Sequence, residues 1–302
     1  MVQLCLVVVQ VLFASLAVTG RLVLPVVPAG LLVTIRIFGA AAALVLLNAA
    51  RGGPWIHDRR DLTRVALSGW LGVTANQSLY LFGLGHSTAV NATILVTTAP
   101  VFTVLGSLLL GLERPSLSKL GGIALAAAGA VYLIDPTRLS FAPGVALGNL
   151  LILLGMVCYA GYFLVSKPLL ARYDAITVGT YVMLFAALGV LPLGIPALRG
   201  MNGGMLHGSI GWLVAYIVVG PTIGAYFLNL WALQRVSSNT VASFLYLQPF
   251  LAAVTAPLIL PGERLTSRTL AAGCLIFVGL GLVLWAERVQ RRQVPMGGLN
   301  AE

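Results

Sequence analysis

Residues 89–134 read AVNATILVTTAPVFTVLGSLLLGLERPSLSKLGGIALAAAGAVYLI, two long apolar runs with the charged pair Glu113-Arg114 between them. A helix of about 20 apolar residues spans the hydrocarbon core of a membrane. Each run is close to that length, and the Glu-Arg pair with Pro115 marks the break between them. The stretch therefore predicts two membrane-spanning helices joined by a short loop.

The rest of the chain has the same character. Of its 302 residues, 59% are hydrophobic and only 9% are charged, which leaves no room for a sizeable soluble domain. The formal net charge of +10 suggests nucleic acid, but the cations cluster beside apolar runs, as Arg59, Arg60 and Arg64 do. Membrane proteins distribute their topology signals in this way. We expect the lipid bilayer as a partner and no nucleic acid.

Apolar runs bounded by Gly, Pro and charged residues predict an all-α integral membrane protein with ten transmembrane helices. The predicted spans are Leu4–Gly20, Gly30–Ala50, Val65–Leu84, Ala89–Leu112, Leu117–Ile134, Val145–Ser166, Ile176–Leu198, Ile210–Leu233, Thr240–Leu260 and Thr269–Ala286.

The two sets of five helices resemble each other. Glu113-Arg114 and Glu263-Arg264 follow equivalent helices, and Pro100 and Pro249 occupy equivalent positions within them. Because each set has an odd number of helices, the second set enters the membrane in the opposite sense. The sequence therefore predicts two inverted five-helix repeats.

The distribution of Lys and Arg predicts the orientation. With the N-terminus in the cytoplasm, the inner segments carry more of these cations than the outer loops. We therefore expect both termini on the cytoplasmic side of the cell membrane.

These features together resemble the drug/metabolite transporter superfamily, specifically its EamA-type ten-helix proteins. The likeness rests on Arg36 within the second helix, the stretch from Pro100 to Arg114, the stretch from Tyr159 to Lys167, and Pro249 followed by Glu263-Arg264. It implies a five-helix EamA-like repeat over residues 1–137, a second over 138–288 and a cytoplasmic tail over 289–302. It also implies a central cavity between the repeats.

The same resemblance implies a secondary transporter that moves small metabolites, amino acids or amphipathic toxic compounds, often outward, by alternating access. No Walker-type loop occurs, so we expect a gradient to drive transport. The alternatives are an integral-membrane enzyme or a structural membrane protein without transport activity. We expect no catalytic residue, metal or cofactor, because no HExxH, GxSxG or Asp-rich motif is present.

Arg36 is the one charge placed well inside a predicted span. A charge inside the membrane is unfavourable unless it is paired or hydrated. Arg36 either lines the outer part of the cavity and attracts a carboxylate or phosphate, or it snorkels outward or binds helix-end carbonyls and so holds the bundle together.

Uncharged polar and aromatic side chains make up the other cavity candidates. Amides and phenols around an apolar cavity suit zwitterionic or aromatic solutes, although interhelical hydrogen bonds also explain such residues. They are Asn76, Tyr80, Tyr159, Tyr162, Asn229, Trp231, Tyr246 and Gln248.

Gate or hinge candidates fall at matched positions in the two halves. Pro100 and Pro249 interrupt hydrogen bonding within their helices and allow a bend. Glu113 and Glu263 form either gates at opposite faces or caps of the following helices.

Overall fold

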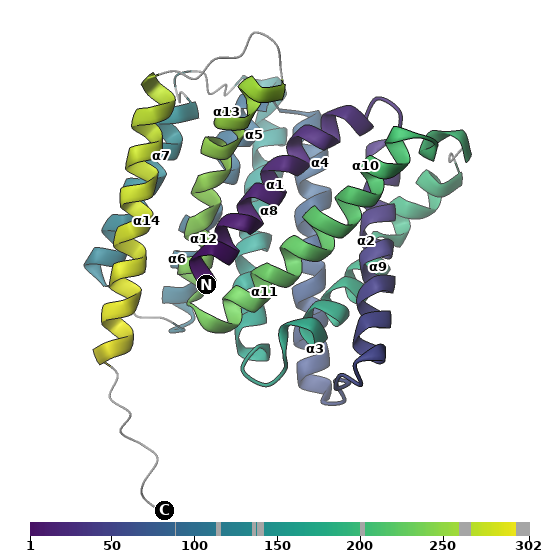
Figure 1. The fold of residues 1–302 in the computed structure, drawn as a ribbon, viewed down its shortest axis with the longest axis horizontal. Coiled ribbons are helices and arrows are strands. Elements are labelled where there is room, and N and C mark those ends of the chain that lie inside the picture. Colours follow the sequence, from purple (N-terminus) through teal and green to yellow (C-terminus); the bar gives the residue numbers. More distant parts are fainter. Residues whose placement is uncertain are drawn as a thin grey trace, which may run out of the picture.

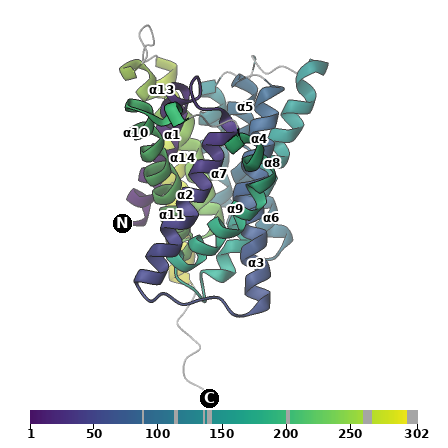
Figure 2. The same cartoon turned by 90° about the vertical axis from the view of Figure 1, so that its right-hand side faces the viewer.

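The structure is a computed structural model that describes residues 1–87, 89–112, 116–134, 137, 142–199, 203–259 and 267–293. These residues form helices and connecting turns, with no strand among them. Figures 1 and 2 show the helices side by side as one bundle, with the loop between α2 and α3 and the C-terminal end of α14 at the same end.

The first half of the chain begins with two regular helices and continues with two interrupted ones. Its elements are α1 (Val2–Val23), α2 (Ala29–Ala50), α3 (Arg59–Gly69), the π-helical turn η1 (Trp70–Ala75), α4 (Asn76–Gly85), α5 (Ala89–Val96), α6 (Ala99–Leu109) and α7 (Leu117–Ile134).

The second half has regular and interrupted helices in the same order. Its elements are α8 (Pro143–Leu169), α9 (Ala175–Arg199), the 3-10 turn η3 (Gly203–Leu206), α10 (Ser209–Ile217), the π-helical turn η4 (Val218–Gly224), α11 (Ala225–Arg235), α12 (Ser238–Ser243), the 3-10 turn η5 (Phe244–Tyr246), α13 (Leu247–Ile259) and α14 (Ser267–Gln293).

Seven helices within the described residues are long and apolar enough to cross a membrane, and a shorter apolar helix covers Val2–Leu16. The predicted spans 65–84 and 240–260 are helical where the structure describes them, as α3–η1–α4 and α12–η5–α13. The count of ten spans stays a prediction.

Close approach between helices depends on facing glycines. A Cβ atom added to Gly279 on α14 would lie 2.6 Å from the carbonyl oxygen of Gly122 on α7. A Cβ on Gly148 of α8 would lie 2.6 Å from the carbonyl oxygen of Gly83 on α4. These backbones pack so tightly that only glycine fits, as is common between membrane helices.

Both candidate hinge prolines follow a break in their helix. The break at Thr97 and Thr98 separates α5 from α6, which carries Pro100 in its first turn. The 3-10 turn η5 precedes Pro249 near the start of α13. Pro100 lies in the first turn of α6, where a missing N–H removes no intrahelical bond. Pro249 is the third residue of α13, just after the point where the helix changes from 3-10 to α geometry.

Candidate functional site

A cavity of about 540 Å³ lies inside the bundle. Its wall combines α1, α2, α4, α5, α8 and α11 with two residues after α12, Leu245 and Gln248. The lining extends to Leu24 and Leu84, which are exposed at the end of the bundle that carries residues 24–28 and 85–87. We call this the open end. The opposite end, with residues 51–58, 170–174 and 236–237, is the closed end.

Arg36 lies in the cavity wall and is only 8% exposed. Its Nε donates to Thr222 Oγ1 at 3.0 Å, and Thr222 in turn donates to the carbonyl oxygen of Ile217 at 2.8 Å. Among the described residues, no carboxylate pairs with Arg36. The side chain therefore links α2 to η4 and also lies in the cavity wall.

The two π-helical turns lie directly before the polar cavity residues. Asn76 follows η1, and Tyr226 comes just after η4. A π turn adds about one residue to a helical turn, which rotates the side chains beyond it relative to those before it. In each case the turn orients the polar positions of the next helix, and both Asn76 and Tyr226 line the cavity.

Four predicted residues besides Arg36 line the cavity: Asn76, Tyr80, Tyr159 and Gln248. Asn76 Nδ2 donates to the carbonyl oxygen of Gly155 at 3.0 Å, and Gln248 Nε2 donates to Gln10 Oε1 at 2.9 Å. These amides hold neighbouring helices together while they border the cavity. Among the residues that the structure describes, the lining contains neither a carboxylate nor a histidine.

Tyr162 and Asn229 lie directly behind the cavity wall. Asn229 Nδ2 donates to the Tyr159 hydroxyl at 3.3 Å, and the rings of Tyr159 and Tyr162 stack with centroids 5.9 Å apart. Both residues are buried, so neither faces lipid. Of the three, Tyr159 alone is in the lining, and Tyr162 and Asn229 contact it from behind.

Other predicted residues lie elsewhere. Trp231 stacks under Arg235, whose guanidinium carbon is 3.8 Å from the ring centroid, and it does not line the cavity. Tyr246 is fully buried in η5, also outside the lining. Pro100 and Pro249 are likewise absent from it. Glu113 and Glu263 lie outside the described residues.

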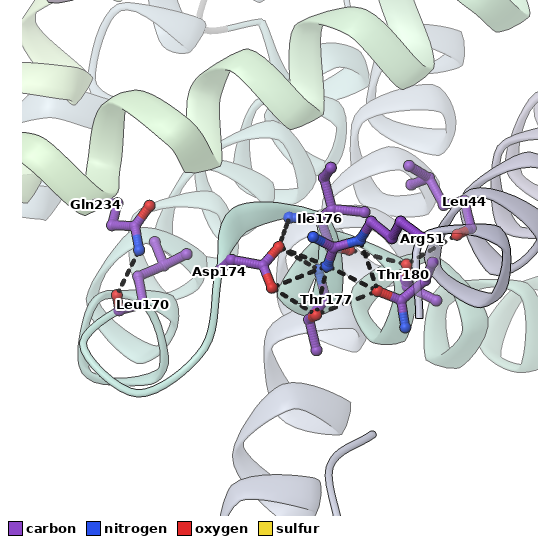
Figure 3. Close-up of polar contacts among 9 residues, drawn as sticks. Leu44, Arg51, Leu170, Asp174, Ile176, Thr177, Thr180 and Gln234 are labelled. Atoms are coloured by element: carbon purple, nitrogen blue, oxygen red, sulfur yellow. Dashed lines mark hydrogen bonds and ion pairs between the residues drawn. The ribbon is translucent and has the colours of Figure 1, made fainter. Parts of the chain in front are cut away.

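Polar contacts fill the closed end (Figure 3). Arg51 Nη2 bonds both carboxylate oxygens of Asp174, at 2.7 and 2.8 Å, and also Asn48 Oδ1 and Thr177 Oγ1. Partial burial raises the pKa of Asp174, but the hydrogen bonds from Arg51 and Thr177 outweigh that effect and hold this pKa below its ordinary value. The cluster joins α2 to the start of α9.

A second cluster at the closed end contains a buried ion pair. Lys119 Nζ on α7 lies 2.9 Å from Glu287 Oε2 on α14, and the two residues are 2% and 9% exposed. The same carboxylate oxygen accepts hydrogen bonds from the hydroxyls of Ser237 and Thr240. This pair ties the last helix to the turn between α11 and α12.

Sequence reasoning did not select three of these residues. Thr222, Lys119 and Glu287 are ordinary polar residues near helix ends or in apolar surroundings, and their partners are distant in the chain. The one signal for Thr222 is its place beside Pro221 within an apolar run. For the ion pair, the only signal is that each charge lies near the same predicted face of the membrane.

Comparisons with known proteins agree with this architecture. The sequence model of the EamA-like transporter family matches the chain twice, over residues 1–134 and 146–285. A probable terminal-alkyne amino-acid exporter of Streptantibioticus cattleyicolor is 32% identical over 249 residues, covering 79% of this chain and 78% of that protein. An uncharacterized transporter of Archaeoglobus fulgidus is 27% identical over 212 residues, 67% of this chain and 72% of that protein.

A solved crystal structure has the same fold. It superposes with a TM-score of 0.77 at 20% identity and covers 95% of this chain and 98% of its own. The family matches extend across nearly the whole chain, so the resemblance seen in the sequence is confirmed. The chain is a multi-pass membrane protein that belongs to the EamA-like transporter family.

Proposed function

We propose that the protein is a secondary transporter of small amphipathic solutes that carry a carboxylate, with amino acids as the leading class. The observation that carries this proposal is Arg36, a buried cation in an otherwise uncharged cavity wall that pairs with no carboxylate of the described residues. A buried guanidinium is stabilised by an anionic partner and binds a carboxylate through two hydrogen bonds. A solute can supply that partner.

The rest of the lining suits the apolar part of such a solute. Phe13, Leu32, Val33, Met156 and Leu245 surround the space beside the polar groups. A cavity of this volume and mixed lining is typical of small-molecule sites. The name of the Streptantibioticus relative, a probable amino-acid exporter, supports the same solute class and outward transport.

Ten membrane-spanning helices in two inverted repeats form the proposed architecture. Several pairs of features support it. The family model matches each half of the chain separately. In each half the third helix contains a π turn, and the fourth contains a break. The packing is paired in the same way. The helix after each π turn packs against the first helix of the other half, α4 against α8 and α11 against α1.

Alternating access follows from this architecture. The cavity reaches one end of the bundle, and polar clusters fill the other. Rocking of the repeats would reverse which end is open. With both termini in the cytoplasm, the closed end is cytoplasmic and the structure corresponds to the outward-open state of an exporter. The enzyme alternative gains little support, because the described lining holds neither a histidine nor a carboxylate, the groups most often used for acid–base chemistry.

Flux in proteoliposomes tests the solute class. We expect the wild-type protein to exchange amino acids and aromatic carboxylates, and Arg36→Gln to lose most of that flux while it stays folded. Arg36→Lys should keep part of it, because the charge remains. Arg60→Gln, which removes an exposed cation at the closed end, is the matched control and should transport normally. Full flux through Arg36→Gln would contradict the proposed role.

Cysteine labelling tests the orientation. Single cysteines replace Trp55 at the closed end and Gly85 at the open end, both exposed, in a protein without Cys5, Cys158 and Cys274. A membrane-impermeant reagent added to intact cells should label position 85 and spare position 55. The reverse pattern would place the termini outside.

A further inference from the structure

Two buried polar atoms behind the cavity have no hydrogen-bond partner among the described residues: the hydroxyl oxygen of Tyr162 and Oδ1 of Asn229. The residues are 0% and 2% exposed. Most buried polar side-chain atoms in proteins are hydrogen-bonded, and a buried atom without a partner is unfavourable. Two such atoms beside one cavity need an explanation.

Both residues lie one helical turn beyond the cavity toward the closed end. Tyr162 is three residues after Tyr159 on α8, and Asn229 is three residues after Tyr226 on α11. Residues three apart share a helix face and differ in height by roughly 4.5 Å. Because Tyr159 and Tyr226 line the cavity, Tyr162 and Asn229 form the next layer below it.

Packing alone does not account for the Tyr162 hydroxyl. The ring rests on Gly72 in η1, where an added Cβ would lie 2.4 Å from Tyr162 Cγ. It also packs against Tyr159, Phe163 and Tyr226. A phenylalanine ring would fill the same space without burying an unpartnered oxygen, so the hydroxyl contributes something that this packing does not require.

Tyr159 separates this layer from the cavity and is bonded to it. Its hydroxyl accepts the Asn229 Nδ2 hydrogen bond while its ring is part of the cavity wall. A shift of Tyr159 therefore uncovers the layer and frees the remaining Asn229 group at the same time. The deeper layer thus lies next to the cavity, with Tyr159 between them.

We propose that Tyr162 and Asn229 form a second solute subsite, which is occupied after the solute passes Tyr159. This rests on the proposed transport function and adds to it the class of polar group that the solute carries. An amide oxygen accepts hydrogen bonds, so Asn229 Oδ1 takes an ammonium or hydroxyl group. The Tyr162 hydroxyl donates to a carboxylate or carbonyl oxygen. The pair fits a zwitterion, an amine and a carboxylate on one small molecule.

Tyr162→Phe is the most direct test. A structural role of the hydroxyl would change the melting temperature, whereas a binding role would change the rate of exchange. Without its orphan hydroxyl the protein should melt at the same or a higher temperature, whereas exchange of a zwitterionic amino acid in proteoliposomes should fall roughly tenfold, as for a lost hydrogen bond to a charged group. Asn229→Leu should reduce exchange of the amino acid more than exchange of the matching carboxylate that lacks the amine.

Tyr181→Phe is the matched control. Its hydroxyl accepts a hydrogen bond from the Ile56 amide near the closed end, outside the cavity lining. The same substitution there should lower the melting temperature slightly and leave exchange at the wild-type rate.

The outcomes separate the two proposals. Wild-type rates in both Tyr162→Phe and Asn229→Leu, with a wild-type protein that exchanges carboxylates, overturn the subsite and leave the proposed function standing. A wild-type protein that exchanges no solute of the panel overturns both. A lower melting temperature in Tyr162→Phe would show that its hydroxyl is bonded in the protein, which also overturns the subsite.

Discussion

The two ends of the bundle use polar residues in opposite ways. At the closed end, Arg51 and Asp174 bond each other and their neighbours, and the Lys119–Glu287 pair is surrounded by donors. Around the cavity, Arg36 pairs with no carboxylate of the described residues, and Tyr162 and Asn229 hold unpartnered atoms. Bonded groups of this kind stabilise the fold, whereas unpartnered atoms beside a cavity are available to a solute. Asn48 Nδ2 at the closed end and the Tyr246 hydroxyl also lack partners among the described residues, but neither residue lines the cavity.

Other contacts at the closed end follow the same rule. The Ser68 and Ser166 hydroxyls lie 2.5 Å apart, and Lys167 Nζ donates to the carbonyl oxygens of Leu233 and Val236. Arg172 pairs with both Asp58 and Asp61. If the comparison is correct, substitutions at this end change stability, and substitutions at the cavity change transport.

The largest expected effect on stability is at the buried ion pair. Lys119→Met leaves the Glu287 carboxylate buried without its cation, and we expect the free energy of unfolding to fall by about 3–5 kcal/mol. Unfolding in mixed micelles measures the change. The double variant Lys119→Met with Glu287→Leu should recover most of the loss, because apolar residues replace a buried pair well. A stable single variant would place the pair in contact with water.

A smaller effect is expected at Thr222. Thr222→Val keeps the shape of the side chain and removes the acceptor for Arg36 Nε, so stability should fall by about 1 kcal/mol. Exchange of carboxylates should weaken in its apparent affinity more than in its maximal rate, since the guanidinium remains and is less well oriented. The matched control is Thr103→Val, another buried threonine outside the cavity lining. Equal transport in the two variants would remove Thr222 from the site.

The smallest effect is expected at Asp174, whose side chain is 39% exposed. Asp174→Asn should lower stability by about 0–1 kcal/mol near neutral pH, as for exposed ion pairs. The pKa of Asp174 is lowered in the folded protein, so its carboxylate stabilises the fold above its unfolded pKa of about 3.9. That contribution disappears as pH falls through the folded pKa.

Melting curves at about pH 7 and about pH 3 measure this dependence. The difference between wild-type and Asp174→Asn proteins should shrink in acid. A difference that grows in acid would mean that the pKa of Asp174 is raised in the folded protein.

Much of the helical architecture was predictable, because apolar runs bounded by charge and proline are strong local signals. The predicted span Gly30–Ala50 matches α2 within one residue at its start. The internal irregularities were not predictable in this way. The π turn η1 lies in a run without proline, so its form depends on packing against other helices. The turn η4 contains Pro221 between Gly220 and Gly224, which indicates an irregularity there but not its π-helical form.

The site was predictable in type more than in position. Arg36 and Tyr159 stood out because charge and phenol groups are unusual inside apolar segments. Tyr159 lines the cavity, whereas Tyr162 lies one turn behind it. The difference depends on how closely the neighbouring helices pack against α8 at each level. A local sequence pattern does not contain the packing distances between helices that are far apart in the chain.

The two π turns also determine the direction in which each face of the following helix points. An α-helix advances about 100° per residue, so if the same residues formed a regular α-helix in place of η1, the faces of α4 would be rotated by about that angle relative to α3. The face that now carries Asn76 and Tyr80 to the cavity would then turn toward a different neighbour, with its composition unchanged. The presence of the π turn therefore determines which residues of α4 form the cavity wall.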